Sequence, residues 1–446
     1  MQIPIPMMEM RFPLVRRALS AAVLLLAAAA PVRAQPLAAP SQGDTTLRII
    51  LLTMGPGDEV WEKFGHNALW VHDPVHGTDK AYNYGMFDFR QQNFVLNFVR
   101  GRMNYWMEGF DAYLTLDHYR MLNRSVWAQE LNLSPEQAQS VRDFLEWNER
   151  PENRFYRYDY YRDNCSTRLR DVLDRILGGQ LRRATARAPS GVTYRWHTRR
   201  LVGEGAGTIP IYTGIDAGLG PEADRPISKW EEMFLPMRLR DEVRALQVRG
   251  PNGQMQPLVA REQTIFTATR PPERRGPPGW LFGYLLAGLA IGGVIALLAS
   301  ATPRSRAARW GFSAVSALWL LFAGFGGVIL LGLWVATDHA IAYRNLNLFQ
   351  LSPFALPLVL FLPALAYGAR WAARWALRLS LVVAAMSVLG LLLKVLPWFH
   401  QVNGEMIALA LPVNLAVAWA AWRLAGAPPV VVTARARRAE RAAVPA

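Results

Sequence analysis

The chain contains little cysteine: Cys165 is the one thiol among its 446 residues. A single cysteine excludes an intramolecular disulfide, so this thiol is either an inert core residue or a functional group. The sequence also lacks a glycine-rich phosphate loop and a cluster of histidine and cysteine at the spacing of metal ligands. Because nucleotide and metal sites need such patterns, we expect no cofactor and no metal.

Acidic residues are fewer than basic ones, 34 against 49, which leaves a net charge of +15. Such an excess can indicate nucleic-acid binding. Here, however, many arginines stand in short loops between apolar segments and in the C-terminal tail, which is the positive-inside pattern of an inner-membrane protein. The charge therefore predicts a membrane protein, with no nucleic-acid partner.

Long apolar runs are concentrated at the two ends of the chain. The first of them has a basic start, an apolar core and a small-residue site, typical of a signal peptide cleaved after Ala34; an uncleaved anchor is the alternative. Further apolar stretches, each long enough to span a bilayer, come after the middle of the chain. They cover residues 280–300, 311–336, 348–369, 377–399 and 405–425.

These runs predict a domain order and a topology. A cleaved signal places the middle of the chain outside, and an odd number of spans returns the tail to the cytoplasm, in agreement with the arginine distribution. The predicted parts are a signal peptide (1–34), a periplasmic catalytic domain (35–270), a linker (271–279), a five-helix transmembrane domain (280–426) and a basic cytoplasmic tail (427–446).

The middle of the chain mixes strand and helix patterns, which predicts an α+β domain. Apolar or alternating runs predict strands at 46–53, 67–72, 80–85, 125–131, 155–161 and 259–269. Helical spacing and capping residues predict helices at 60–64, around 94–99, and at 134–147, 165–177 and 228–242. The stretch 178–220 has a looser pattern and is expected to be rich in loops.

Cys165 stands at the start of one of these predicted helices. Apolar residues recur at helical spacing over 169–177, and Gly178 and Gly179 end the run. Asn164 is a good N-cap, which places Cys165 in the first turn. There the helix dipole and the free backbone N–H groups favour a thiolate. We therefore predict a nucleophilic thiol; a buried, inert cysteine is the alternative.

A thiol nucleophile needs a base and a third group that orients the imidazole. His66, at the start of a predicted strand, is the best-placed histidine, and a core or surface role is its alternative. The neighbouring strand offers Asn83 as the orienting residue. Tyr82 and Tyr84 are alternatives and candidates for substrate binding, because a register shift of one residue would change the answer. The backbone N–H of Cys165 and a further donor would form an oxyanion hole.

Other residues are candidates for substrate binding. Asn164 and Ser166 flank the cysteine, and His339 and Asn345 lie on the loop between the second and third apolar stretches. That loop is either a solvated connection or a surface that meets the periplasmic domain and helps bind a lipid head group. The segment 87–113, dense in aromatic residues and methionine, is either core or a wall that contacts acyl chains.

The histidine precedes the cysteine here, whereas papain-like enzymes have the cysteine first. This order resembles the circularly permuted branch of the NlpC-type papain-like fold, which includes lecithin:retinol acyltransferase. At family level, motifs over residues 45–240 resemble the Lnb N-terminal periplasmic domain family, and motifs in the membrane half resemble the membrane region of its members. The motifs are Phe64-Gly65-His66-Asn67-Ala68-Leu69-Trp70-Val71, Tyr82-Asn83-Tyr84-Gly85, Phe87-Asp88-Phe89, Asn164-Cys165-Ser166-Thr167, Leu219-Gly220 with Asp224, Met233-Phe234-Leu235-Pro236, Asn345-Leu346-Asn347-Leu348 and Ser352-Pro353.

The resemblance implies a permuted papain-like α+β domain followed by an all-α transmembrane domain. The family takes its name from a bacterial lipoprotein N-acyltransferase. The implied activity is transfer of an acyl chain from a phospholipid donor to the free α-amine of a lipoprotein acceptor, at the membrane. Cys165 would carry the acyl group as a thioester, and His66 would move the proton. The alternatives are a periplasmic cysteine amidase or peptidase acting on cell-wall peptides, and a non-enzymatic membrane assembly or binding protein.

Overall fold

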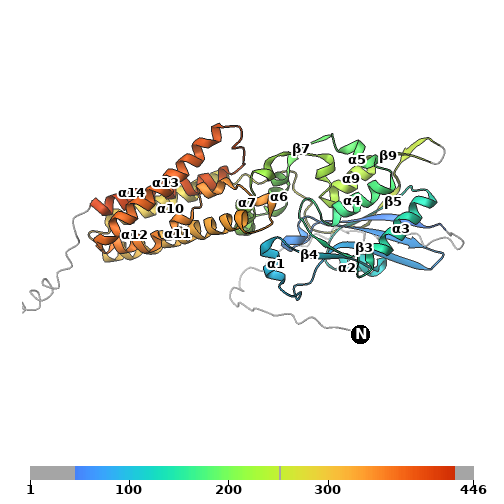
Figure 1. Ribbon diagram of the computed structural model, residues 1–446, viewed down its shortest axis with the longest axis horizontal. Coiled ribbons are helices and arrows are strands. Elements are labelled where there is room, and N and C mark those ends of the chain that lie inside the picture. Colours follow the sequence, from blue (N-terminus) through green and yellow to red (C-terminus); the bar gives the residue numbers. More distant parts are fainter. Residues whose placement is uncertain (1–45, 251–252, 427–446) are drawn as a thin grey trace, which may run out of the picture.

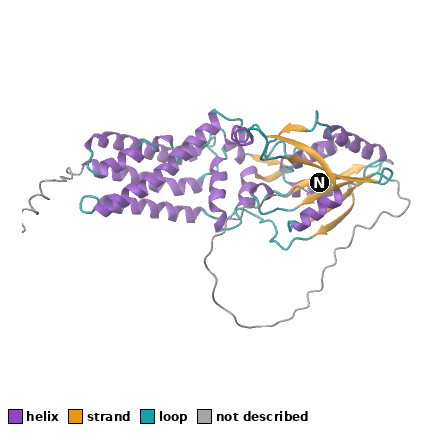
Figure 2. Cartoon of the chain, turned by 90° about the horizontal axis from the view of Figure 1, so that it is seen from below, coloured by secondary structure: helices purple, strands orange, loops and turns teal. Residues whose placement is uncertain are grey.

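The computed structural model of the protein describes residues 46–250 and 253–426. A mixed α/β part and a helical bundle lie end to end (Figure 1), and the strands are confined to the first of them (Figure 2). The last strand of the large sheet ends at Phe266 and the first long apolar helix begins at Leu281. The predicted signal peptide (1–34) and cytoplasmic tail (427–446) lie outside the described residues.

The α/β part is built on a seven-stranded sheet in the order β11-β5-β1-β2-β3-β4-β6. Every neighbouring pair is antiparallel. The strands are β1 (Arg48–Met54), β2 (His66–Asp73), β3 (Thr78–Met86), β4 (Asn104–Asp111), β5 (Val126–Leu131), β6 (Phe155–Arg157) and β11 (Val259–Phe266). Five of the predicted strands are confirmed, whereas the one predicted at 155–161 ends early because Asp159 caps a turn directly after it.

Helices cover both faces of this sheet. Alternating side chains of β1 enter two different cores. Ile49 and Leu51 pack on the side of α4 (Cys165–Ile176), and Ile50 and Leu52 pack on the side of α2 (Ala112–Met121). The helices of this part are α1 (Phe94–Arg100), α2 (Ala112–Met121), α3 (Pro135–Glu149), α4 (Cys165–Ile176), α8 (Lys229–Glu232) and α9 (Pro236–Ala245), besides the short 3-10 turn η1 (Val60–Glu62).

The stretch 178–220, predicted as loop-rich, is mostly helical. Its helix α6 (Tyr194–Val202) buries three basic side chains, Arg195, His197 and Arg200, among its few apolar ones. The hydrophobic periodicity that marks a helix is therefore weak in this stretch, which explains the wrong prediction. Its elements, with the small strands beyond it, are α5 (Gln180–Thr185), β7 (Pro189–Thr193), α6 (Tyr194–Val202), α7 (Ile209–Gly218), β8 (Pro226–Ser228), β9 (Gln247–Arg249) and β10 (Met255–Pro257).

Within the described residues, the helical part contains four helices that are long and apolar enough to cross a membrane, or five spans if one bent pair counts as a span. They are α10 (Leu281–Ala301), α11 (Arg306–Val335), α13 (Ala373–Leu392) and α14 (Gly404–Gly426). The third predicted span, 348–369, is not one continuous helix: short turns over Leu346–Ala355 meet α12 (Leu358–Ala366) at an angle of 55°. Pro353 and Pro357 lack the N–H that would continue the backbone ladder.

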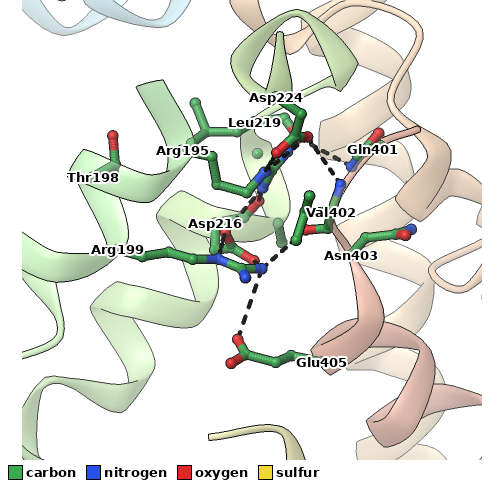
Figure 3. A network of polar contacts seen from close by, with 12 residues as sticks. Arg195, Thr198, Arg199, Asp216, Leu219, Asp224, Gln401, Val402, Asn403 and Glu405 are labelled. Atoms are coloured by element: carbon green, nitrogen blue, oxygen red, sulfur yellow. Dashed lines mark hydrogen bonds and ion pairs between the residues drawn. The ribbon is translucent and has the colours of Figure 1, made fainter. Parts of the chain in front are cut away.

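A buried polar network joins the two parts (Figure 3). Arg195 of α6 is only 1% exposed and donates to Asp216 and Asp224. Arg199, one turn further along α6, binds Asp216 and the backbone carbonyl of Val402, just before α14. The N–H of Val402 in turn donates to Asp224 at 3.0 Å. These bonds hold the α/β part against the outer end of the bundle.

Candidate active site at the start of helix α4

Helix α4 begins as predicted. The side-chain oxygen of Asn164 accepts from the backbone N–H groups of Ser166 at 3.0 Å and Thr167 at 2.9 Å. The Thr167 hydroxyl accepts in return from the backbone N–H of Asn164. Such a reciprocal box satisfies donors that a helix start otherwise leaves free, and it fixes Cys165 as the first helical residue.

The polar groups that flank the thiol hold the helix in place. The Asn164 amide donates to the carbonyls of Tyr160 and Phe234, both at 2.9 Å. The Ser166 hydroxyl donates to the carbonyl of Met233 at 2.7 Å. Both residues are buried and their side chains anchor α4 to the segment that precedes α9. Their role in substrate binding stays a prediction.

The thiol of Cys165 is buried, with 8% of the residue exposed. Burial raises its pKa to about 11, whereas hydrogen bonds from the backbone N–H groups of Asn67, Ser166 and Cys165 oppose that rise. The predicted thiolate is therefore not the resting state of this structure. The helix start does favour the anion, but desolvation by the surrounding side chains outweighs that effect.

His66 and Asn83 form the hydrogen bond that the orienting role requires. The His66 Nε2 and Asn83 Oδ1 atoms are 3.0 Å apart, and the Asn83 amide nitrogen donates to the carbonyl of Ala81 at 2.9 Å. With that nitrogen engaged, Asn83 presents its oxygen to the ring, so Nε2 carries the proton and Nδ1 keeps its lone pair. Burial and, after it, the charge of Arg124 lower the pKa of His66 to about 4, so the imidazole is neutral at pH 7.

The two tyrosines beside Asn83 point to the opposite face of the sheet. Tyr82 and Tyr84 belong to the core on the α4 side, where they are 3% and 1% exposed. The Tyr84 hydroxyl donates to Asn148 of α3. Because side chains alternate along a strand, the register that directs Asn83 toward His66 buries both tyrosines on the other face, so they do not orient the base. That face also contains Cys165, and substrate binding by the tyrosines stays a prediction.

Asn67, Tyr119 and Arg124 connect the base to the thiol. The backbone N–H of Asn67, the residue after His66, donates to the sulfur of Cys165. Tyr119 of α2 stacks on the imidazole, with ring centroids 6.2 Å apart. The guanidinium of Arg124 lies 4.8 Å from the Tyr119 ring centroid and favours the thiolate of Cys165 and the neutral form of His66. The candidate site thus lies at the end of the sheet where β2 begins.

Tyr119 and Arg124 were not found from the sequence. Arg124 is 4% exposed and donates to the carbonyl of Gly55 and to Glu62, and its Nη2 atom is buried without a partner among the described residues. A single arginine before a strand carries no local signal, and Tyr119 is one of many aromatic residues in this part of the chain. Only the packing of α2 against the sheet brings them to His66.

The loop between the second and third predicted spans does meet the α/β part. The Nε2 of His339 donates to the carbonyl of Phe98 at 2.9 Å, and its ring stacks on Tyr160. Asn345 is 2% exposed and its amide donates to the carbonyls of Ala217 and Leu219. The amide of Asn345 therefore joins the two parts of the chain, whereas half-buried His339 remains at the surface. Head-group binding by this loop stays a prediction.

The aromatic segment 87–113 divides between the two interpretations. Tyr105 and Met107 are core residues, whereas Phe89 and Phe98 are exposed at 60% and 42%. A groove of about 340 Å³ lies elsewhere, between α3 and α4, and Cys165 is not part of its lining. Within residues 46–250 and 253–426, no group of three or more His, Cys, Asp or Glu side chains is arranged to hold a metal ion.

Comparison with known proteins gives two matches. The family model of the Lnb N-terminal periplasmic domain matches residues 43–204, and that of the Lnb transmembrane domain matches residues 284–423. The first range contains the thiol, the imidazole and the orienting amide, and the second covers the apolar helices. No curated protein and no solved structure matches the chain.

Proposed function

The chain belongs to the Lnb family, and on that premise we propose that it is a membrane-anchored periplasmic cysteine acyltransferase. Its periplasmic domain and transmembrane helices are those of an inner-membrane protein. The proposed donor is a phospholipid and the proposed acceptor is the N-terminal amine of a lipoprotein. The order of His66 and Cys165 further supports a permuted papain-like relationship for the periplasmic domain.

The observation that carries this proposal is the bond between His66 and Asn83. It holds the proton on Nε2 and leaves Nδ1 of a neutral imidazole as a base, beside a strand residue, Asn67, that contacts the sulfur of Cys165. Cysteine, histidine and asparagine are the residue types of the papain-like catalytic group. The hydrogen bond to Asn83 would also stabilise the imidazolium that forms when the thiol loses its proton.

The proposed reaction has two acyl transfers. In the first, Nδ1 of His66 takes the proton of the Cys165 thiol, the sulfur attacks the ester carbonyl of the lipid, and the leaving alcohol of the lysolipid takes the proton. The result is a thioester on Cys165. In the second, His66 takes a proton from the acceptor amine as the amine attacks, an amide forms, and the proton returns to the sulfur. No oxidant, metal or nucleotide is needed.

Backbone N–H groups are available for the oxyanion of each tetrahedral intermediate. Those of Cys165 and Asn67 both bond to the sulfur, so we propose Asn67 as the further donor that the sequence did not identify. The buried charge of Arg124 adds positive potential at the same place. Donors that are already in place when charge develops lower the barrier without reorganisation.

The apolar surroundings favour a lipid over a cell-wall peptide. Tyr158 borders Cys165 across Gly85, where a Cβ would lie 3.6 Å from the nearest atom of each side chain. Tyr105 and Phe87 continue this aromatic contact away from the thiol. Aminolysis of a thioester competes with hydrolysis, so a site that excludes water suits acyl transfer better than it suits an amidase.

Intact-mass measurement of the purified protein after incubation with phospholipid tests the proposal. We expect a fatty-acyl adduct that hydroxylamine removes, absent from Cys165→Ala and strongly reduced in His66→Ala. His76→Ala is the matched control, because His76 is an exposed histidine on the turn after β2 and should leave the adduct unchanged. Absence of the adduct on the wild-type protein, together with a thiol that no alkylating reagent reaches in the folded state, would refute the proposal.

A further inference from the structure

Helix α1 carries an apolar face that the other residues described by the structure do not cover. The α1 face consists of Val95, Leu96, Phe98 and Val99, of which Val95 is 72% and Val99 54% exposed. Four exposed apolar side chains on a helix of seven residues are too many for a solvated surface. They indicate contact with an apolar partner that residues 46–250 and 253–426 do not supply.

The end of α1 is fixed beside the outer end of a transmembrane helix. The carbonyl of Arg100 accepts from the backbone N–H of Asp338 at 2.9 Å, and the Asp338 carboxylate binds Arg102. Asp338 is three residues beyond Val335, where α11 ends, and three residues extend over at most about 11 Å. Helix α1 therefore lies close to the end of α11 that faces the α/β part (Figure 1).

The contact between these two segments is tight. Gly101, which ends α1, has φ +71, and a Cβ there would lie 3.1 Å from backbone atoms of Asp338 and His339. The carbonyl of Phe98 also accepts from His339. These hydrogen bonds hold α1 to the loop after α11, so its position relative to the membrane is set by the fold.

A continuous row of aromatic rings leads from the α1 face to the thiol. Successive ring centroids in this row are between 4.5 and 6.4 Å apart, which is contact distance for aromatic pairs. The row ends beside Gly85, which borders Cys165. In order from the α1 face its members are Phe98, Phe94, Phe87, Tyr105 and Tyr158.

From these observations we infer that the α1 face inserts into the outer leaflet of the bilayer and that the aromatic row guides a lipid acyl chain from there toward Cys165. The occupant is lipid because α1 is bonded beside the end of α11, an apolar helix long enough to cross a membrane. Trp334 and Val335 at that end are also exposed, so the two exposed apolar surfaces lie next to each other. The second half of the inference rests on the proposed function, since it names how the acyl donor reaches the same thiol. The first half, lipid contact, holds independently of any reaction.

Site-directed labelling tests the lipid contact without using catalysis. Because Cys165 is the one cysteine, Cys165→Ala provides a background for a single introduced cysteine. Val95→Cys or Val99→Cys is labelled with an environment-sensitive fluorophore, and the full chain is placed in phospholipid nanodiscs that contain doxyl-labelled lipid. Val75→Cys is the matched control, a valine 66% exposed on the turn between β2 and β3.

The labels at positions 95 and 99 should shift to the blue and lose fluorescence to the doxyl lipid, and the label at position 75 should do neither. If the labels at positions 95 and 99 show neither the blue shift nor the quenching, α1 does not enter the leaflet and the inference is overturned. A response that is equally strong at the control position would also overturn it, because the contact would then not be specific to the α1 face.

A second pair of variants tests the path to the thiol in the protein with Cys165 intact. The double variant Val95→Asp, Val99→Asp should slow acyl loading from bilayer phospholipid about tenfold, because charges replace the side chains that enter the apolar layer. Alkylation of Cys165 by a small water-soluble reagent should stay unchanged, and so should loading in Val75→Asp. Equal loading in all variants would overturn the path. Quenching at position 95 without any adduct on the wild type would keep the lipid contact and refute the proposed function.

Discussion

The charge state of Cys165 leads to the most discriminating prediction. A thiol with a pKa of about 11 is ionised in about one molecule in 10,000 at pH 7, whereas one with the ordinary value of 9.0 is ionised in about one in 100. The thiolate population is therefore lower by a factor of about 100 in the folded protein. Alkylation by iodoacetamide should be slower by at least that factor than in the urea-unfolded chain.

The dependence on pH separates this state from a thiolate–imidazolium pair. With a neutral thiol and a neutral imidazole, the alkylation rate should rise about tenfold per pH unit from pH 7 to 10, without a plateau. His66→Ala should leave this profile nearly unchanged, since a neutral ring does not stabilise a thiolate by its charge. Cys165 is the one alkylatable thiol, so intact mass reports its modification alone. A plateau with an apparent pKa below 7, lost in His66→Ala, would show that the resting site is an ion pair and would refute the reasoning.

Three further predictions concern the surroundings of the site. Asn83→Ala should lower the rate of acyl loading by about 10 to 100-fold without changing the circular dichroism spectrum, because the imidazole loses the bond that orients it; an unchanged rate would exclude the orienting role. Asn164→Ala should destabilise the periplasmic domain by about 2–4 kcal/mol, because the helix cap is lost and two buried carbonyls lose their donor. Thermal unfolding measures this loss, and an unchanged unfolding temperature would show that the cap is dispensable. The free energy of unfolding should fall as the pH drops from 6.5 toward 4. In this range His66, with its folded pKa of about 4, stays neutral in the folded protein while the same histidine binds a proton in the unfolded chain. If a His66→Asn variant showed the same pH dependence, the loss would come from other groups.

Interactions between neighbours in the sequence were the most predictable. The helix start at Cys165 depends on Asn164 and on apolar spacing within the next twelve residues, so the cap and the helix result from local chemistry. The pairing of β2 with β3 results from two apolar runs joined by a short turn, and it places Asn83 opposite Ala68 in the register that the His66 bond needs. Strand alternation then decided between Asn83 and its tyrosine neighbours, a choice that the sequence had left open.

Features that depend on distant segments were predicted wrongly or missed. Helix α6 buries Arg195 and His197, whose partners come from other parts of the chain, so its pattern resembled a loop. The bent pair Leu346–Ala355 and Leu358–Ala366 was predicted as one continuous span, because apolar composition alone does not show where a helix breaks. Asn345 proved to be a joint between domains, since its acceptors lie in α7 and the residues after it.

The sequence by itself determined that a mixed α/β domain precedes the apolar helices, and it determined the helix that presents Cys165 and the strand that presents His66. Each of these depends on composition or on spacing over a few residues. Only the tertiary structure decided that the thiol and the imidazole are both neutral, and that Tyr119 and Arg124 accompany them. The physical reason is that a pKa depends on desolvation and on charges from every packed element, and these are set when distant segments fold together.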